Sequence, residues 1–208
     1  MALWGVLKDS RYQVVPLLTA VTEDYGRVSM HGVRRELVAT QAHRLGLPLR
    51  EVLIPKDSSN DTYETRMGRA LEDFRSRGVT GVAFGDIFLE DLKKYRQDKL
   101  AQVGLSGLFP IWKQDTRRLA EGFIEAGFKA VITCADTQCL DGRFAGREYD
   151  RQLLNDLPSS VDPCGENGEF HSFAYDGPIF SQAVCFSGGQ VVLRESRFSF
   201  CDLIPPVQ

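Results

Sequence analysis

The most distinctive chemistry in the chain lies in the stretch 165–169, which joins a flexible backbone to two carboxylates. Glycines permit positive φ and a close approach to a ligand, and the two glutamates can orient a cation, hold a metal or accept a proton. A plain turn with solvated glutamates is the alternative interpretation. The residues that could act in this stretch are therefore Glu166 and Glu169, within the loop formed by Gly165, Asn167 and Gly168.

Five cysteines and three histidines offer a second kind of chemistry, metal binding or redox exchange. Only Cys134 and Cys139 are close together, and their spacing differs from the C-x-x-C of a zinc site or redox loop. Reduced cysteines in apolar surroundings are the favoured interpretation. A redox or metal protein built from Cys134, Cys139, Cys164 and His171 is the distant alternative. A nucleophilic Cys164 is disfavoured because the sequence places no activating histidine beside it.

Composition narrows the class of protein. The 208 residues form one full-sized domain or a domain with a small appendage, and the formal charge of -3 excludes a generic polyanion binder. Apolar runs such as Gln13–Val21 fall short of the roughly 20 residues that span a bilayer. Met1–Lys8 lacks the basic leader of a secretory signal. We therefore expect a cytoplasmic protein with no nucleic-acid or membrane partner.

The candidate residues must be positioned by helices and strands. Over the first two-thirds of the chain, the hydrophobic pattern alternates between one typical of strands and one typical of helices. Apolar runs predict strands, and spaced apolar residues between them predict helices. The expected strands are 12–21, 50–54, 79–84 and 130–135, and the expected helices are 33–45, 60–77, 89–103 and 116–126. Asn60 or Asp61 is the expected cap of the second helix.

This alternation predicts an α/β fold with a doubly wound parallel sheet, Rossmann-like in organisation, with helices on both faces. Ligands of such folds bind beyond the carboxyl ends of the strands. The polar loops that follow strands are 22–32, 85–87 and 136–142, and these are the expected places for chemistry.

The sequence pattern changes after about Leu157, where prolines and glycines replace the helical spacing of apolar residues. Residues 180–186 and 190–200 are expected to form two strands around the turn Ser187-Gly188-Gly189. The expected organisation is therefore an α/β nucleotide-binding domain over residues 1–157 and a small β-rich substrate region over residues 158–208.

The N-terminus resembles the last turns of a helix that leads directly into a strand. In a doubly wound domain, a first strand and a glycine-rich turn would precede that helix. We therefore interpret Met1 as an internal methionine of a longer gene product, with a genuine short start as the alternative. A strand edge left without its neighbour could pair with a second copy, so a homodimer is also expected.

The segment 162–180 resembles the G-E-G-G-E-Y-E-T-F signature, with its following D-x-P-x-F, of the diphthine–ammonia ligase family. Two other segments agree, since 84–112 is similar to the family's G-D-I … Y-R … P-L-W stretch and 127–133 to its G-x-x-A-x-I strand entry. The family's S-G-G-K-D-S phosphate loop is absent, and Asn167 and His171 replace a glycine and a glutamate of the signature.

The resemblance implies the adenine nucleotide alpha-hydrolase-like fold of PP-loop ATP pyrophosphatases. It also implies a reaction in which ATP adenylates a substrate carboxylate, pyrophosphate leaves and ammonia displaces AMP. The implied cofactors are ATP and Mg²⁺, and the implied partners are ammonia and a carboxylate on a small molecule or a protein. A nucleotide-binding or regulatory module of the same fold, without catalysis, is the alternative.

The resemblance also assigns nucleotide-binding roles to residues of two loops that follow strands and of the next helix, namely Ser29, Met30, His31, Gly85, Asp86 and Arg96. Asp86 would bind Mg²⁺ or a nucleotide hydroxyl, with capping of the next helix as its alternative role. Arg96 would neutralise phosphate, with a solvated helix face as the alternative. Within the signature, Glu166 and Glu169 would be catalytic, because they would orient ammonium or accept the proton of the attacking ammonia. The resemblance implies substrate-binding roles for Gly165, Asn167, Gly168, His171 and Asp176.

Overall fold

The computed structural model describes residues 1–206, and these residues form two compact units. The first unit contains residues 1–25 and 48–114, and the second contains residues 26–47 and the chain from residue 115 onward. The units are groups of residues in contact. They carry no information on function, so the predicted division into a nucleotide-binding domain up to residue 157 and a substrate region after it stays a prediction.

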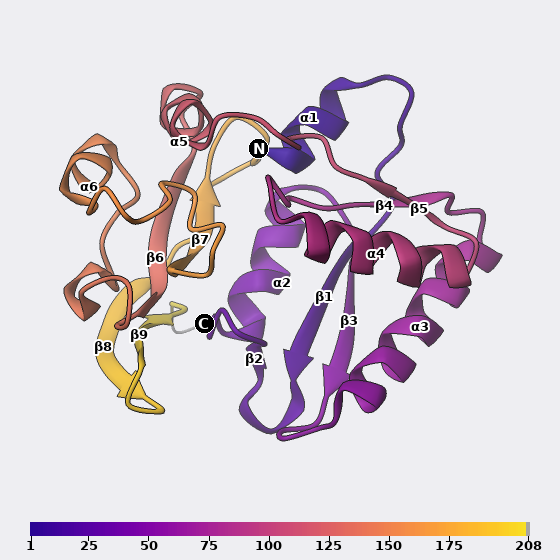
Figure 1. The fold of residues 1–208 in the computed structure, drawn as a ribbon, viewed down its shortest axis with the longest axis horizontal. Coiled ribbons are helices and arrows are strands. Elements are labelled where there is room, and N and C mark those ends of the chain that lie inside the picture. Colours follow the sequence, from indigo (N-terminus) through magenta and orange to yellow (C-terminus); the bar gives the residue numbers. More distant parts are fainter. Residues whose placement is uncertain (207–208) are drawn as a thin grey trace. The chain divides into compact units, whose positions relative to one another are not determined.

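Two pairs of parallel strands form the framework of the first unit (Figure 1). Strand β1 (Leu17–Thr22) pairs with β3 (Leu49–Ile54), and β4 (Gly81–Ala83) pairs with β5 (Ser106–Leu108). The helices of this unit are α1 (Ala2–Lys8), η1 (Glu23–Tyr25), α3 (Asn60–Ser76) and α4 (Glu90–Gln102). The parallel strands agree with the expected α/β class, whereas a doubly wound sheet is not confirmed.

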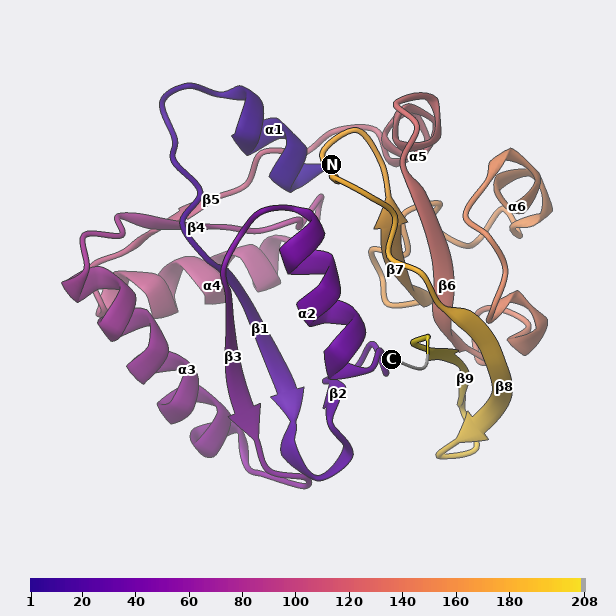
Figure 2. The ribbon, with the colours of Figure 1, turned by 180° about the vertical axis from the view of Figure 1, so that it is seen from behind.

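Helix α3 lies alongside β1 and β3, as Figure 2 shows from behind. Its inner stripe is the one expected from apolar spacing, with Met67 and Ala70 against the strands and Leu71 against Leu100 of α4. The expected cap was wrong by one residue, because Ser59 is the N-cap and its side chain accepts a hydrogen bond from the backbone N–H of Thr62.

The strand expected over 12–21 begins later, at Leu17. Pro16 has no backbone N–H to donate to a strand ladder, so a strand start just after it is physically reasonable. The backbone N–H of Leu17 donates to Pro48 O at 2.8 Å and opens the pairing with β3.

The second unit is built on an antiparallel sheet with the strand order β7-β6-β9-β8. These strands are β6 (Lys129–Asp136), β7 (Phe170–Asp176), β8 (Ser187–Arg194) and β9 (Phe198–Ile204). The same unit contains the short β2 (Arg27–Val28) and the helices α2 (Arg35–Arg44), α5 (Thr116–Glu125), η2 (Gly142–Phe144) and α6 (Arg151–Asp156).

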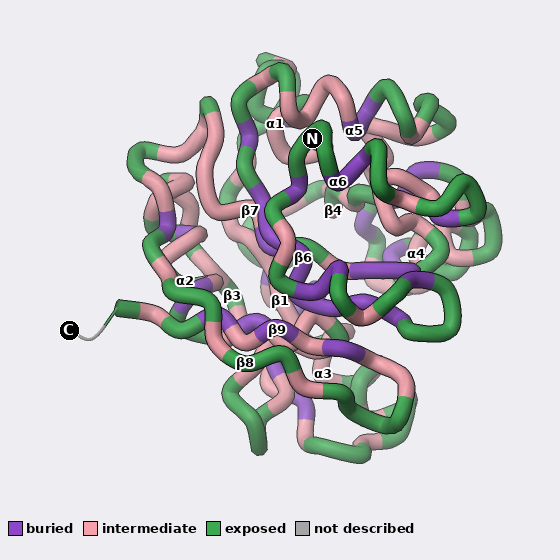
Figure 3. Tube along the Cα trace, turned by 90° about the vertical axis from the view of Figure 1, so that its left-hand side faces the viewer, coloured by how far each residue is buried: buried purple, intermediate pink, exposed green. Residues whose placement is uncertain are grey.

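Strand β6 was expected to join the parallel strands, and this was wrong, because it pairs antiparallel with both β7 and β9. Its side chains are buried from Ala130 to Asp136, and Figure 3 shows this buried stretch in purple. Ala130 and Ile132 pack in one cluster with α5 and α6, while Val131 packs in another with Leu37 of α2. Burial on both faces produces the continuous apolar run that is also typical of central parallel strands.

The C-terminal hairpin exists, but its expected turn and first strand were wrong. The turn lies at Glu195-Ser196, where both residues have φ of +52°, and the backbone N–H of Arg197 donates to Arg194 O. Two central residues with positive φ are typical of the tight turns that match strand twist. Residues 187–189 instead belong to β8, next to an irregularity in its register with β9.

Candidate functional site

The segment Asp162–Glu169, called here the carboxylate loop, links the end of α6 to β7. Its first turn is formed by Asp162, whose Oδ1 accepts hydrogen bonds from the backbone N–H of Cys164 at 2.8 Å and of Glu166 at 3.2 Å. An aspartate that binds the backbone a few residues ahead stabilises a turn locally. Asp162 therefore fixes the chain that carries Glu166, a residue whose side chain is half-buried.

Glu169 closes the same loop from its other end, and its side chain is buried. Its Oε1 accepts hydrogen bonds from the backbone N–H of Asp162 and from Asn167 Nδ2, both at 2.9 Å. Its Oε2 accepts from the backbone N–H of Asn167 at 3.0 Å. Hydrogen bonding of this kind compensates a carboxylate for its burial. Glu169 thus has a clear structural role in the loop, and its predicted catalytic role stays a prediction.

Gly165 and Gly168 have φ of +69° and +87°. A Cβ on Gly165 would lie 2.7 Å from the backbone oxygen of Phe170, whereas a Cβ on Gly168 would meet no atom within 4 Å. Both positions require the left-handed region that glycine tolerates best, and only Gly165 also requires the missing side chain. The two glycines of the signature therefore shape the loop backbone.

The carboxylate loop is attached to the rest of the second unit at three points. The Tyr149 hydroxyl donates to Pro163 O, the Cys164 thiol donates to Thr116 O at 3.3 Å, and the backbone N–H of Asp136 donates to Glu169 O. Burial raises the pKa of the Cys164 thiol to about 12. A thiol held in its neutral form is a poor nucleophile, in agreement with the low weight given to that role.

Asp136 was expected only as the first residue of the polar loop 136–142, with no role of its own, and it stands at the end of the apolar run that forms β6. Its buried carboxylate forms a two-pronged ion pair with Arg197 of the β8–β9 turn, with Nε lying 2.9 Å from Oδ1. The Arg197 contact lowers the pKa of Asp136. Asp136 therefore joins the hairpin turn to the strand that supports the carboxylate loop.

The structure brings together two histidines that were predicted separately, one for nucleotide and one for substrate. The rings of His31 and His171 have centroids 4.4 Å apart. Burial, with a smaller effect of the neighbouring His171, lowers the pKa of His31 to about 4, and burial also lowers that of His171. Both imidazoles are therefore neutral at pH 7 and can each offer one donor and one acceptor. His171 is the second residue of β7, directly after the carboxylate loop.

The other residues predicted around His31 lie on a turn. Ser29 O accepts a hydrogen bond from the backbone N–H of His31 at 2.8 Å, and Met30 has φ of +67° and is 69% exposed. Asp176, in contrast, stands at the opposite end of β7 and pairs with Lys129 at 3.1 Å. At about 3.3 Å per residue, the strand separates it from the carboxylate loop by roughly 20 Å.

The predicted residues Gly85 and Asp86 lie in the first unit, just beyond β4, and Arg96 lies in α4 of the same unit. Asp86 is buried, and its Oδ2 lies 2.7 Å from Arg96 Nε in an ion pair. The guanidinium of Arg96 also lies 4.4 Å above the ring of Phe84. Arg96 thus pairs with one oxygen of the Asp86 carboxylate, and the predicted magnesium role of Asp86 stays a prediction. Within residues 1–206, no group of three or more His, Cys, Asp or Glu side chains is arranged to hold a metal ion.

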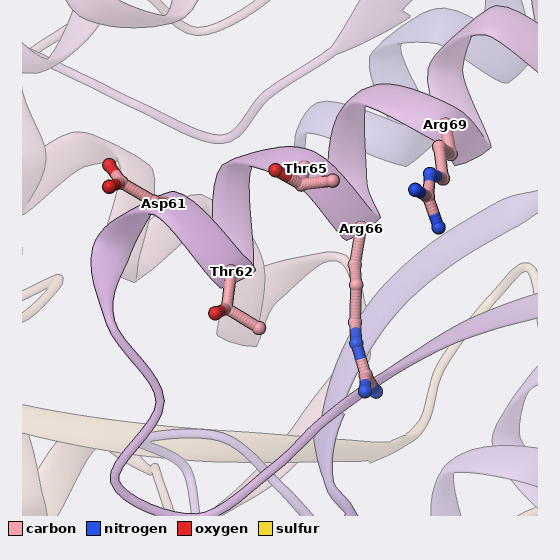
Figure 4. Close-up of a pocket in the computed structure, with 5 residues that line it drawn as sticks. All are labelled: Asp61, Thr62, Thr65, Arg66 and Arg69. Atoms are coloured by element: carbon pink, nitrogen blue, oxygen red, sulfur yellow. The ribbon is translucent and has the colours of Figure 1, made fainter.

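A shallow pocket on the first turns of α3 contains none of the predicted site residues (Figure 4). Its lining is Asp61, Thr62, Thr65, Arg66 and Arg69. Arg66 donates to the backbone oxygen of Leu53 and pairs with Glu23 at 3.5 Å. Its guanidinium therefore serves to connect α3 with the ends of neighbouring elements.

Residues 115–196 match the profile of the family described as the diphthamide synthase C-terminal domain. The matched range begins at the cap of α5, contains the whole carboxylate loop and ends in the β8–β9 turn. The chain is also similar to members of the diphthine–ammonia ligase family. The expected resemblance is thus confirmed, and it includes the loop whose geometry is described above.

Three relatives named diphthine–ammonia ligase illustrate the similarity. The Danio rerio protein is 25% identical over 191 residues, which cover 84% of this chain and 74% of the relative. The Homo sapiens protein is 25% identical over 147 residues, covering 67% and 53%. The Schizosaccharomyces pombe protein is 23% identical over 145 residues, covering 68% of this chain but 23% of the relative. The match therefore spans about half of the human relative and a smaller share of the yeast one.

None of the helices formed by residues 1–206 has the length and apolar character needed to cross a membrane.

Proposed function

We propose that this chain takes part in ATP-dependent formation of an amide from a carboxylate and ammonia, as in the diphthine–ammonia ligase family. In the first step, the substrate carboxylate attacks the α-phosphate of ATP, giving an acyl-adenylate and pyrophosphate. In the second step, ammonia attacks the acyl carbon and AMP leaves with the bonding electrons. The attacking nitrogen loses one proton, which a nearby base must accept.

The observation that carries this proposal is the carboxylate loop, which lies within the range related to the diphthamide synthase C-terminal domain. Asp162 and Glu169 use their carboxylates to hold the loop backbone. Of the two predicted catalytic glutamates, we assign the proton-accepting role to Glu166, whose backbone N–H donates to Asp162. A positioned carboxylate that accepts a proton contributes about 10²–10⁴-fold to a rate.

The neutral histidine pair supports a second role. An uncharged imidazole has one hydrogen-bond donor and one acceptor, so it can bind a nucleotide base or an acyl group without attracting the phosphates by charge. His171 follows the carboxylate loop and contacts His31, so one contact joins the predicted nucleotide residue to the predicted substrate residue. We assign this pair to substrate orientation. No step is assigned to magnesium, which Asp86 would help to bind beside its contact with Arg96.

The test is amide formation with isotopically labelled ammonium, ATP and a protein that carries diphthine, the group in the relatives' name. Mass spectrometry should show the label in the product, with AMP and pyrophosphate released. Glu166→Gln should lower labelling about 10²–10⁴-fold. Glu125→Gln is the matched control, because Glu125 forms an exposed surface pair with Arg151.

The alternative function, a nucleotide-binding module without catalysis, makes a different prediction for the same assay. Such a module would bind ATP but would release no AMP with any carboxylate and ammonium. Diphthine that stays unlabelled, together with unchanged ATP, would therefore contradict the ligase proposal.

A further inference from the structure

The ends of β4 and β5 carry a cluster of aromatic rings and cations to which no function has been assigned above. Lys93 Nζ lies 4.0 Å from the ring centroid of Trp112 and 5.1 Å from that of Phe109. Phe109 contacts Trp112 edge-on at 6.0 Å and stacks on Phe84 at 5.6 Å. All of these residues lie in the first unit and are half-buried. The Lys93 ammonium is thus held above two aromatic faces.

The charge of Lys93 has no carboxylate partner within residues 1–206, whereas the other lysines of α4 are paired. Lys94 pairs with Asp98 and Lys99 with Glu64, each at 2.6 Å. Arg96, three residues along the same helix face, is held by Asp86. Lys93 is therefore the cation of this helix that remains available to an external anion.

The aromatic cluster around Lys93 lies at the carboxyl ends of two parallel strands, a common place for ligands in α/β folds. Strands β4 and β5 are parallel and end at Ala83 and Leu108, and Phe84 and Phe109 follow directly. Ligands of parallel α/β sheets bind beyond such carboxyl ends. A compact ammonium group is a common partner of phosphate, and an indole ring gives such a site a flat apolar wall.

We propose that Lys93 and Trp112 form a binding site for the phosphate groups of a nucleotide or of pyrophosphate. Lys93 supplies the positive charge, and Trp112 with Phe109 holds its side chain in place. The choice of phosphate as the anion rests on the proposed ligase function, in which ATP enters and pyrophosphate leaves. The site itself rests on the contacts of Lys93.

The chain offers a direct optical test, because it contains only the tryptophans Trp4 and Trp112. In a Trp4→Phe background, fluorescence reports on Trp112 alone. Inorganic pyrophosphate, ATP and AMP are titrated in turn at constant ionic strength, with sodium chloride as the control. We expect a saturable change in Trp112 fluorescence with pyrophosphate or ATP, and a response to AMP would place the α-phosphate at the site.

Two substitutions decide the role of Lys93. Lys93→Met should weaken binding about ten- to a hundredfold, as expected for the loss of one charge-assisted contact, and Lys93→Arg should retain most of it. Lys94→Met is the matched control, because Lys94 already pairs with Asp98, and it should bind as the parent does. Lys93→Gln replaces Lys93→Met if circular dichroism shows that the methionine variant is unfolded.

An equal response of Lys93→Met and the parent would overturn the inference, and so would the absence of any saturable response to the three phosphates. Measuring AMP formation in parallel separates this inference from the proposed function. Phosphate binding that depends on Lys93 without AMP formation would support the site and contradict the ligase. AMP formation that is unchanged in Lys93→Met would support the ligase and contradict the phosphate site at Lys93.

Discussion

The imidazole rings of His31 and His171 lie 4.4 Å apart, although one follows a short N-terminal strand and the other stands near the start of β7. The contact places two neutral imidazole rings next to each other, just after the carboxylate loop. Because burial penalises the charged form of each ring, the pair also makes the fold sensitive to mild acid.

The first prediction concerns this sensitivity. The pKa of His31 is lowered from 6.5 to about 4, so above pH 6.5 the ring is neutral in the folded and unfolded chain and stability is unaffected. As pH falls from 6.5 towards 4, only the unfolded chain takes up the proton, and the free energy of unfolding decreases. Thermal melts across this range should show the loss, and His31→Gln should reduce it.

Proton NMR titration supplies the check on the assignment. The resonances of His31 should shift near pH 4, and they can be assigned from their loss in the spectrum of His31→Gln. Titration of His31 near pH 6.5 would show that its ring is not desolvated by its surroundings.

The second prediction concerns Glu169. Glu169→Gln keeps one acceptor oxygen but sets an amide group against the backbone N–H of Asn167 or Asp162, which leaves a buried donor without a partner. Such a group costs about 1–3 kcal/mol, and denaturant unfolding should measure the loss. Asn167→Ala removes the Nδ2 contact and should cost about 0.5–1.5 kcal/mol. If Glu169→Gln were as stable as the exposed control Glu125→Gln, the loop-holding role would be wrong.

The third prediction compares two glycines with similar backbone angles. Gly168→Ala should destabilise the fold by about 1–2 kcal/mol, which is the usual penalty of a side chain in the left-handed region. Gly165→Ala should cost more, because its Cβ would also lie 2.7 Å from Phe170 O. Equal melting temperatures for the two variants would contradict the close packing of the loop against Phe170.

The fourth prediction concerns Asp202 of β9, which forms ion pairs with Arg34 at 2.7 Å and Arg27 at 2.9 Å. Hydrogen bonding to Arg34, and more weakly to Arg27, lowers its pKa from 3.8 to about 2 despite partial burial. The stabilisation is therefore present above pH 4 and is lost as pH falls from about 4 to 2. Asp202→Asn should be less stable than the parent at pH 7, and the difference should narrow below pH 3.

Local signals were enough to predict much of the fold. The helices α2 to α5 lie close to their expected ranges, because apolar spacing and flanking polar residues define a helix locally. The expected strand 50–54 agrees with β3 for the same reason. The resemblance in the segment 162–180 was also visible in the residues themselves.

The errors share a physical cause, which is that strand pairing is not encoded locally. Strand β6 looks like a parallel strand because both of its faces are buried, and only β7 and β9 show its true direction. Glu195 and Ser196 turn the hairpin without glycine, so the more obvious glycines at 188 and 189 were misleading. The His31–His171 contact and the Asp86–Arg96 pair also arise from tertiary structure.

The central claim is that Glu166 accepts a proton during amide formation, and one coupled assay tests it most directly. AMP and labelled amide are measured together, with the diphthine-bearing protein, for the parent chain and for Glu166→Gln. The parent should form the two products in equal amounts. Glu166→Gln should lose about 10²–10⁴-fold in amide while pyrophosphate exchange into ATP continues. Equal losses in amide formation and pyrophosphate exchange, or no loss in either, would contradict the account.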